Sequence, residues 1–433
     1  MLKKYSNFCS VPWKQFATST DGFQRMCCMM SPLPGSDHEG KRSITHGWFM
    51  YNNVNKIPVS AGLDAYINSD SSREIKKLLL DNHAPEQCRC YFNENIVEDN
   101  AESKRQYTLK NHGINTDEDV EKFISKQHKI NYFDIRLGNV CNLQCLMCYG
   151  GLSNQLYDQS LFANDADEME LVDGFHIRKV DDKIVYDKAA EQKTFGWADA
   201  AFFKNLEKNV IESFERDPDQ LIEFYFIGGE PLLNKPHFDF LNRMVELNYN
   251  KKIQLEYNTN LTVLDHDILD LWTKFEGITL AISIDDIGKR YEYIRYPGKW
   301  DKVESNLSDI KVFLDKHSDV FRTINIVSVI NIFTADNHTN LVKVMKGYGF
   351  NVYKLISHDP RGTTPKVLTR EQKDRFIDII PHDEHFNELK KYILGFEYKP
   401  DEALHLKRMI QFWDSKRRTK FIDTYPELAN IIF

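Results

Sequence analysis

Three cysteines lie close together in the stretch NVCNLQCLMCYG, residues 139–150, with the spacing Cys141-x3-Cys145-x2-Cys148. In a reducing compartment, clustered cysteines indicate metal binding or catalysis more than disulfides. A structural zinc site needs four ligands, and the nearest histidine downstream is His176. Three thiolates suit a four-iron four-sulfur cluster whose fourth iron stays open to a small molecule. The alternative is a reduced cysteine cluster, or a zinc site that takes a distant ligand.

The cysteines follow a strand-like segment, YFDIRLGN, in a region where strands and helices alternate. Six β-rich runs are predicted at 133–137, 221–227, 252–258, 277–284, 323–329 and 351–357. Amphipathic helices are predicted between them at 237–247, 265–275, 300–317 and 337–349. This alternation is typical of a parallel α/β sheet or barrel. The cysteines then lie at the C-terminal edge of the sheet, where such proteins place their chemistry.

The segment CNLQCLMC resembles the cluster-binding signature of the radical S-adenosylmethionine superfamily. The resemblance implies an α/β fold, a partial (β/α)6 TIM-like barrel, and its strand number agrees with the six runs above. It also implies a 4Fe-4S cluster and S-adenosyl-L-methionine as cofactors. The segment IGGEPLL, at the end of the second strand, is similar to the family's GGE motif. There Gly228 and Gly229 would permit a close approach of backbone and ligand, and Glu230 would bind the amino group of the cofactor.

Polar residues at the ends of the later strands complete the resemblance. They occur in YNTNLT, SIDD and VSVIN, and by resemblance they line the ribose, carboxylate and adenine of the cofactor: Asn260, Ser283, Asp285 and Asn331. Arg295 would pair with the cofactor carboxylate through a bidentate fork. Met147 stands where many members carry an aromatic residue, and a thioether fills similar apolar space. No catalytic residue beyond the cluster ligands is assigned.

The N-terminal region carries the other five cysteines: Cys9, Cys27, Cys28, Cys88 and Cys90. The segments around them resemble the cysteine-bearing parts of SPASM and twitch-type radical enzymes, which bind an auxiliary iron–sulfur cluster. Zinc is the alternative ligand for this region.

Three parts of the chain are expected. Residues 1–125 form a cysteine-rich, twitch-like domain, and residues 126–362 form the partial barrel, interrupted by an acidic insertion at 150–195. Residues 363–433 form a C-terminal helical appendage, in which Pro381 and Pro400 break the helices. The basic run KRRTK (416–420) in this appendage is typical of a solvated helix face.

The function implied by the resemblance is reductive cleavage of S-adenosyl-L-methionine, followed by hydrogen abstraction from a substrate. A peptide or protein is the first expectation for that substrate, and a sugar, nucleoside or nucleotide-linked compound is the second. A flavodoxin or ferredoxin would donate the electron. The alternative from another class is an iron–sulfur or zinc protein that transfers electrons or acts as a sensor without catalysis.

The composition of the chain restricts the kinds of partner that it is expected to bind. The formal net charge of -8 and the lack of a Lys and Arg stripe argue against nucleic-acid binding. No apolar run approaches the roughly 18 residues that a membrane span requires. The N-terminus lacks the apolar stretch of a secretory signal, so a cytoplasmic location is expected.

Overall fold

The computed structural model describes residues 2–27, 57–85, 88, 90, 94, 103–126, 128–148, 151–156, 177–180, 183–186, 195–357 and 362–433. Cys28 and most of the predicted insertion at 150–195 lie outside these residues.

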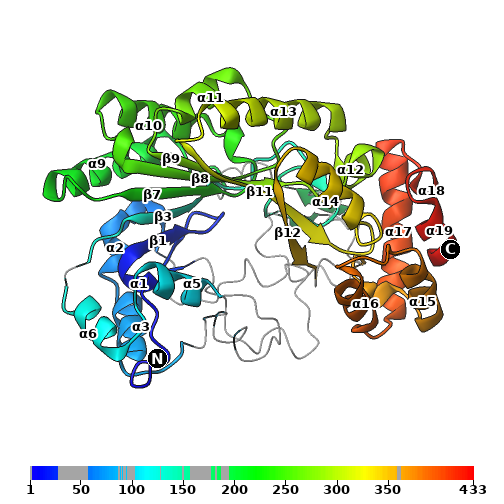
Figure 1. The fold of residues 1–433 in the computed structure, drawn as a ribbon, viewed down its shortest axis with the longest axis horizontal. Helices are drawn as coiled ribbons and strands as arrows, with labels where there is room; N and C mark the ends of the chain where they lie inside the picture. The colour runs from blue at the N-terminus through cyan, green and yellow to red at the C-terminus, as the bar shows by residue number, and fades with distance from the viewer. Residues whose placement is uncertain are drawn as a thin grey trace.

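All six predicted strands are confirmed, and they lie side by side in parallel in an eight-stranded sheet (Figure 1). They are β3 (Tyr132–Arg136), β7 (Ile222–Ile227), β8 (Ile253–Thr259), β9 (Gly277–Ser283), β11 (Phe321–Ile330) and β12 (Asn351–Ile356). Each strand pairs in parallel with the next one along the chain. Sequential parallel pairing is the strand order of a (β/α) barrel, so all six C-terminal strand ends lie on one edge.

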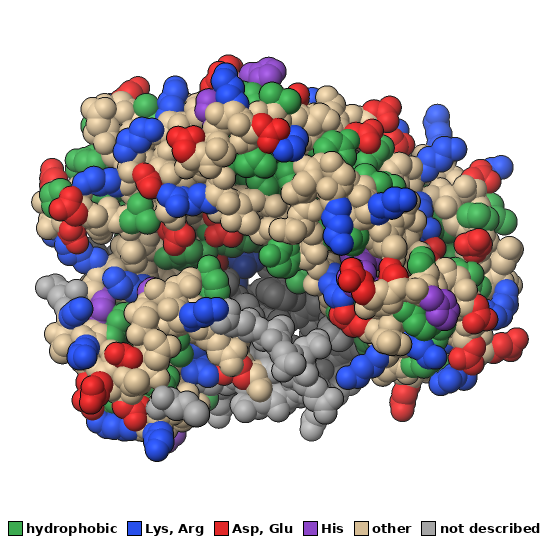
Figure 2. All heavy atoms as spheres, in the orientation of Figure 1, with side chains coloured by type: hydrophobic (Ala, Val, Ile, Leu, Met, Phe, Trp, Pro, Cys, Tyr) green, Lys and Arg blue, Asp and Glu red, His purple; other side chains and the backbone are tan. Residues whose placement is uncertain are grey.

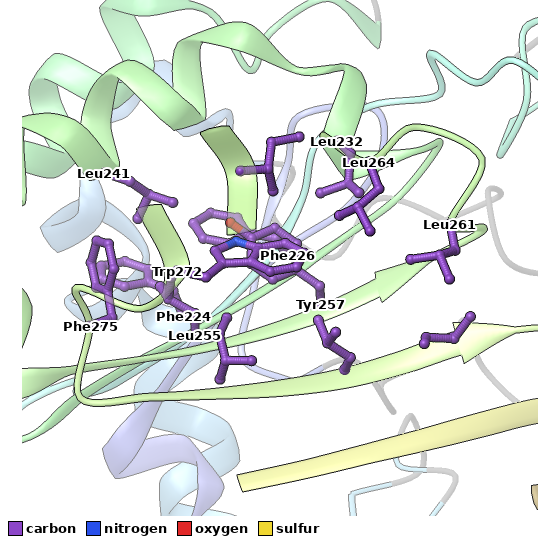
Figure 3. Close-up of a cluster of buried hydrophobic side chains, with 14 of the residues drawn as sticks. Phe224, Phe226, Leu232, Leu241, Leu255, Tyr257, Leu261, Leu264, Trp272 and Phe275 are labelled. Atoms are coloured by element: carbon purple, nitrogen blue, oxygen red, sulfur yellow. The ribbon is translucent and has the colours of Figure 1, made fainter. Parts of the chain in front are cut away.

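Helices cover the apolar face of this sheet. They are α9 (Ala200–Arg216), α10 (Lys235–Glu246), α11 (His266–Trp272), α12 (Gly288–Ile294), α13 (Trp300–Lys316) and α14 (His338–Gly347). The predicted helices at 237–247, 265–275, 300–317 and 337–349 are therefore confirmed. Side chains alternate between the two faces of a strand, and Phe224, Phe226 and Tyr257 point to the helix side, where they pack with Trp272 (Figure 3).

The N-terminal segment extends the sheet instead of standing apart from it. Its elements are α1 (Val11–Lys14), β1 (Gln15–Thr18), β2 (Gln24–Arg25), α2 (Leu63–Ile67), α3 (Asp70–Leu80), α5 (Lys104–Asn111) and α6 (Asp117–Ile124). β1 pairs in parallel with β3, which places Phe16 opposite Phe133, and β2 pairs antiparallel with β1. Away from the sheet, the described residues of this segment form two small apolar clusters, one around Cys9 and Cys27 and the other around Phe8 and Phe123.

Two short antiparallel ladders lie outside the main sheet. β5 (Ile177–Val180) and β6 (Lys183–Tyr186) form a hairpin within the predicted insertion. β4 (Gln144–Cys145) pairs with β10 (Arg295–Tyr296) beside the main sheet.

The C-terminal helices share a core with the end of the barrel. They are α15 (Arg370–Asp378), α16 (Phe386–Leu394), α17 (Pro400–Arg417), α18 (Phe421–Thr424) and α19 (Pro426–Ile432). Pro400 occupies the first turn of α17, where a missing N–H costs nothing. Trp413 and Tyr425 belong to one apolar cluster with Leu146 and Ile294 of the barrel. The helices predicted for this region are present, and they contact the segment that carries the three cysteines.

Figure 2 shows Lys, Arg, Asp and Glu side chains interspersed over the visible face, without a broad area of one sign. Within the described part of the chain, no helix combines the length and apolarity that crossing a membrane requires.

One core histidine, His237 of α10, is fully buried and neutral. Its Nδ1–H donates to the carbonyl of Asn234, and its Nε2 accepts from the Tyr257 hydroxyl at 3.1 Å. Burial lowers the pKa of His237 to about 3. The unfolded chain takes up a proton at this residue below its ordinary pKa of about 6.5, whereas the folded chain does not. This residue therefore makes the fold less stable as the pH falls from about 6.5 toward 3.

We expect His237→Gln to remove about 1.4 kcal/mol per pH unit from the slope of unfolding free energy against pH between about pH 6 and 4. Urea denaturation at several pH values measures that slope. The control is His83→Gln, because His83 is exposed and the slope should remain that of the wild type. Equal slopes in His237→Gln and the wild type would contradict the prediction, whatever the absolute stability of the variant.

Candidate functional site

The loop that carries the three cysteines, residues 138–148, is called the cysteine loop here. It begins where β3 ends, and its far part is held by the β4–β10 ladder, in which Cys145 lies opposite Arg295. The amide of Leu146 donates to the carbonyl of Ile294 at 2.9 Å, and the amide of Cys148 donates to the carbonyl of Cys145 at 3.1 Å. The part of the loop that carries Cys145 and Cys148 is therefore fixed by backbone hydrogen bonds.

Cys141 lies beside the end of β8. The amide of Leu143 lies 3.4 Å from the Cys141 sulfur, and Nδ2 of Asn260 lies 3.9 Å from it. The same Nδ2 donates to Oδ1 of Asn142 at 3.0 Å. N–H groups directed at a sulfur stabilise its thiolate form and tune the potential of a cluster that it binds. The structure thus brings Asn260, predicted as a cofactor residue, next to the first cysteine.

Cys145 lies beside a buried ion pair. Nη1 of Arg295 lies 3.8 Å from the Cys145 sulfur, while Nε of Arg295 donates to Oδ2 of Asp285 at 2.7 Å. Oδ1 of Asp285 accepts from the amide of Val329 at 2.8 Å. Arg295 and Asp285, both predicted as cofactor residues, therefore bind each other and connect the second cysteine to β11.

The two glycines of IGGE approach the cysteine loop closely. Both have positive φ, 90° at Gly228 and 54° at Gly229. A Cβ on Gly229 would lie 2.2 Å from the carbonyl oxygen of Val140, and one on Gly228 would lie 3.0 Å from that of Gly138. The amide of Glu230 also donates to Val140 at 2.8 Å. The glycines are required here because they let the end of β7 pack against the backbone of the cysteine loop.

The Glu230 carboxylate is buried and accepts three hydrogen bonds. Oε1 accepts from the Thr259 hydroxyl at 2.6 Å and from the amide of Leu232 at 3.2 Å, while Oε2 accepts from the amide of Asn260 at 2.7 Å. Burial raises the pKa of Glu230 to about 7, and these bonds act in the opposite direction. Its carboxylate joins the end of β7 to the end of β8, directly behind the cysteine loop.

The thiols of Cys141 and Cys145 are stable as neutral groups unless a cation is bound. Burial raises the pKa of Cys141 to about 12, and it raises the pKa of Cys145 as well. A bound metal offsets that cost, because it favours the thiolate form. Three sulfurs, two of them faced by N–H groups, fit an iron–sulfur cluster. Among the described residues, no three His, Cys, Asp or Glu side chains are grouped as ligands of a single metal ion.

The other predicted cofactor residues have less direct links to the cysteines. Ser283 is the last residue of β9 and is half-buried. Asn331 is fully buried, and its Oδ1 accepts from the amide of Phe333 at 2.8 Å, which holds the turn after β11. Met147 packs against the C-terminal apolar cluster. Within the described residues, no hydrogen bond links Ser283 or Asn331 to the cysteine loop, and their cofactor roles remain predictions.

Arg417 is a site residue that the sequence did not reveal. It belongs to the run KRRTK, which predicted a solvated helix face, yet its side chain is buried. That prediction is wrong for this residue, because the guanidinium turns inward to the cysteine loop and donates to the carbonyl of Gln144 at 2.8 Å. The two residues are 273 positions apart, so no local motif carries a signal for the contact.

The N-terminal cysteines meet in a second place. Cys9, Cys27, Cys88 and Cys90 line one pocket. Arg105 lies at the pocket too, where it forms a buried ion pair with Glu94 and donates through Nη1 to the carbonyl of Phe8 at 3.1 Å. Cys28 lies outside the described residues.

The thiols of this pocket differ in acidity. Burial raises the pKa of Cys9 to about 12. The Cys88 thiol donates to the Cys90 sulfur, which lowers the pKa of Cys90 to about 7 and raises that of Cys88 strongly. The pocket therefore contains at least one sulfur that ionises easily.

We expect Glu230→Gln to lower the free energy of unfolding by about 1 to 3 kcal/mol, because an amide offers one acceptor oxygen where three donors converge on two. The denaturation midpoint of the protein without metal measures this loss. Glu223→Gln in β7, the strand that precedes Glu230, is the control, since Glu223 is half-buried and its pKa is raised by burial. If the two variants are equally stable, the three hydrogen bonds to Glu230 contribute nothing.

No protein-family model matches the chain, and no curated protein matches it. Solved structures are similar to it at low identity. Native anSMEcpe with bound AdoMet is 18% identical over 66% of this chain and 60% of its own, with a TM-score of 0.32. Streptococcus suis SuiB is 13% identical over 85% of this chain and 65% of its own, with a TM-score of 0.35. The radical S-adenosylmethionine methyltransferase TsrM from Kitasatospora setae, with cobalamin and a [4Fe-4S] cluster bound, is 10% identical over 55% of each chain, with a TM-score of 0.30. The chain thus spans 60% of the length of anSMEcpe. Since these TM-scores are low, we draw the function from the residues of the site.

Proposed function

We propose that this chain is a radical S-adenosylmethionine enzyme. The observation that carries the proposal is that several of the predicted cofactor residues contact the loop that carries the cysteines. Cys141 is contacted by Asn260, Cys145 is contacted by Arg295, and Glu230 packs on the same loop. The ends of the parallel strands β3, β7 and β8, together with β10, supply these residues, as a cluster with a cofactor cradle requires. A protein that only transfers electrons has no need of the cradle.

Cys141, Cys145 and Cys148 would hold a 4Fe-4S cluster through three irons and leave the fourth open to S-adenosyl-L-methionine. When bound, these groups supply a 5'-deoxyadenosyl radical, which abstracts hydrogen from the substrate. The task of the chain is to hold the sulfurs in a rigid frame. The β4–β10 ladder fixes Cys145, and the contact between Gly229 and Val140 fixes the start of the loop.

Glu230 would receive the amino group of the cofactor. A carboxylate accepts about four hydrogen bonds, and three come from the protein, so one position remains. The positive charge of an ammonium group would also offset the burial that raises the pKa of Glu230, so binding would favour the ionised carboxylate.

We infer a peptide or protein substrate, because auxiliary metal sites accompany peptide-modifying enzymes in the resembled group. A sugar, nucleoside or nucleotide-linked substrate is the second candidate. The sheet face opposite the helices carries Asp134, Tyr225 and Glu256 in one row across β3, β7 and β8. Such a row favours a substrate rich in polar groups. A flavodoxin or ferredoxin in the cytoplasm would supply the electron.

We also propose a second metal centre in the N-terminal pocket. Four cysteines line it, which is the ligand number of an auxiliary iron–sulfur cluster and also of a structural zinc site. The apolar cluster around these cysteines is small. Metal binding would therefore add to the stability of this segment as well as to its chemistry.

Replacing any one of Cys141, Cys145 and Cys148 by Ala removes a ligand from a site that has none to spare. We expect the anaerobically reconstituted wild type to form 5'-deoxyadenosine from S-adenosyl-L-methionine, and each variant to fall to background. Chromatography of the reaction mixture measures the product. Cys88→Ala, in the other pocket, should keep the absorbance of the first cluster. Cleavage at the wild-type rate in a variant of the loop would refute the assignment of these ligands.

If the N-terminal pocket binds a second cluster, the number of iron atoms per chain should show it. We expect about eight irons per reconstituted chain, and about four when Cys88 and Cys90 are both replaced by Ala. Elemental analysis of iron and zinc gives both numbers. Four irons with one zinc in the wild type would favour a structural zinc site. About four irons and no zinc in both proteins would exclude a metal at these cysteines.

A further inference from the structure

Arg417, the last residue of α17, joins β4, the strand that carries Cys145, to the end of α12, just before β10. Its Nη1 donates to the carbonyl of Tyr293 at 2.9 Å, and its Nη2 donates to the carbonyl of Gln144 at 2.8 Å. Gln144 precedes Cys145 in β4, and Tyr293 lies two residues before the start of β10. One planar guanidinium thus joins the backbones on both sides of the ladder, a geometry that its fixed fork of donors suits.

The position of this guanidinium is set from outside the loop. It lies over the ring of Tyr296, 5.0 Å from the centroid, and over that of Trp413 at 5.6 Å. Trp413 belongs to the apolar cluster that joins the C-terminal helices to the barrel. α17 ends directly after Arg417, because Arg418 adopts the left-handed conformation that terminates a helix. The C-terminal helices stand beside α12, which leads into β10 (Figure 1).

The charge of Arg417 is buried, and no direct ion pair balances it among the described residues. Arg417 is 6% exposed, its guanidinium hydrogen-bonds to two carbonyls, and the carboxylate of Asp414 acts on it only through space. Arg295 differs, because Asp285 neutralises it. Burial lowers the pKa of Arg417 to about 10, so the group is a cation at neutral pH. An unbalanced buried charge is costly, and a nearby group of opposite sign would remove that cost.

We propose that Arg417 is a positioning residue for Cys145, and that its charge is balanced by the cluster at the cysteine loop and raises the reduction potential of that cluster. This inference rests on the proposed function. A cluster ligated by thiolates becomes more negative when it is reduced, so a nearby cation stabilises the reduced form more than the oxidised form. The C-terminal helices, which no sequence motif explained, thereby acquire a role at the site.

Two substitutions separate the two roles of Arg417, its pair of hydrogen bonds to Tyr293 and Gln144, called the clamp, and its charge. Arg417→Gln removes the charge and one arm of the fork. Arg417→Lys keeps the charge, but a single ammonium cannot reproduce the two hydrogen bonds with the geometry of the fork. Arg418→Gln is the matched control, because Arg418 is the neighbouring arginine and is exposed.

The experiment is a redox titration of each reconstituted protein, followed by the electron paramagnetic resonance of the reduced cluster, together with the rate of iron release to a chelator. We expect Arg417→Gln to have a more negative potential than the wild type. Arg417→Lys should keep the potential but release iron roughly tenfold faster, the effect of about one lost hydrogen bond to a charged group. Arg418→Gln should match the wild type in both measurements.

Each outcome decides the inference. Equal potentials in Arg417→Gln and the wild type, or equal shifts in the Lys and Gln variants, would overturn the role of the charge. Iron release from Arg417→Lys at the wild-type rate would overturn the clamp, and this test remains if the Gln variant assembles no cluster. A wild type that binds no cluster refutes both proposals. A cluster whose potential shifts as expected, in a protein that does not cleave the cofactor, refutes the proposed function alone.

Discussion

The contact between Gly229 and the backbone of Val140 sets how closely the end of β7 approaches the cysteine loop, and with it the positions of Glu230 and Asn260. No side chain fits at residue 229, so the end of β7 lies directly against the cysteine loop. Glu230 follows at once and reaches across to the end of β8, where Asn260 is held beside Cys141. A larger separation between the two backbones would break this sequence of contacts at its first step. The glycines are thus a packing requirement of the loop, whatever ligand lies above it.

Charged groups are also distributed unequally around the cysteines of the site. Around Cys145 it places two guanidiniums, one paired with Asp285 and one bound only to carbonyls. Around Cys141 it places an amide, from Asn260, and a carboxylate one residue layer behind it. The sulfurs of Cys141 and Cys145 therefore lie in unequal fields, and the irons they would bind would not be equivalent. Such a difference in environment is one of the means by which a protein tunes a cluster.

The sequence predicted the six strands and the main helices because their side chains alternate with the period of each element, as in IEFYFI and IQLEYNT. The resemblance of its motifs to a known family also predicted that Glu230, Asn260, Asp285 and Arg295 belong to one site. It did not predict that Asp285 and Arg295 bind each other, because that pairing depends on the ladder between β4 and β10. The prediction that Arg417 lies on a solvated helix face is wrong because the sequence of a basic run does not show which of its side chains turn to solvent and which to the core.

The pairing of β1 with β3 has a consequence for the order in which the chain folds. The amide of Arg136 donates to the hydroxyl of Thr18, 118 residues earlier, and this bond lies beside the last pair of the ladder. During synthesis, β1 leaves the ribosome well before β3 and can pair only with the two-residue strand β2 until β3 follows, so it cannot start the parallel sheet. The parallel sheet must begin at β3 and grow to both sides, and closing so long a loop is slow. The segment around Cys9 and Cys27 therefore has to remain soluble during that interval with little apolar core of its own.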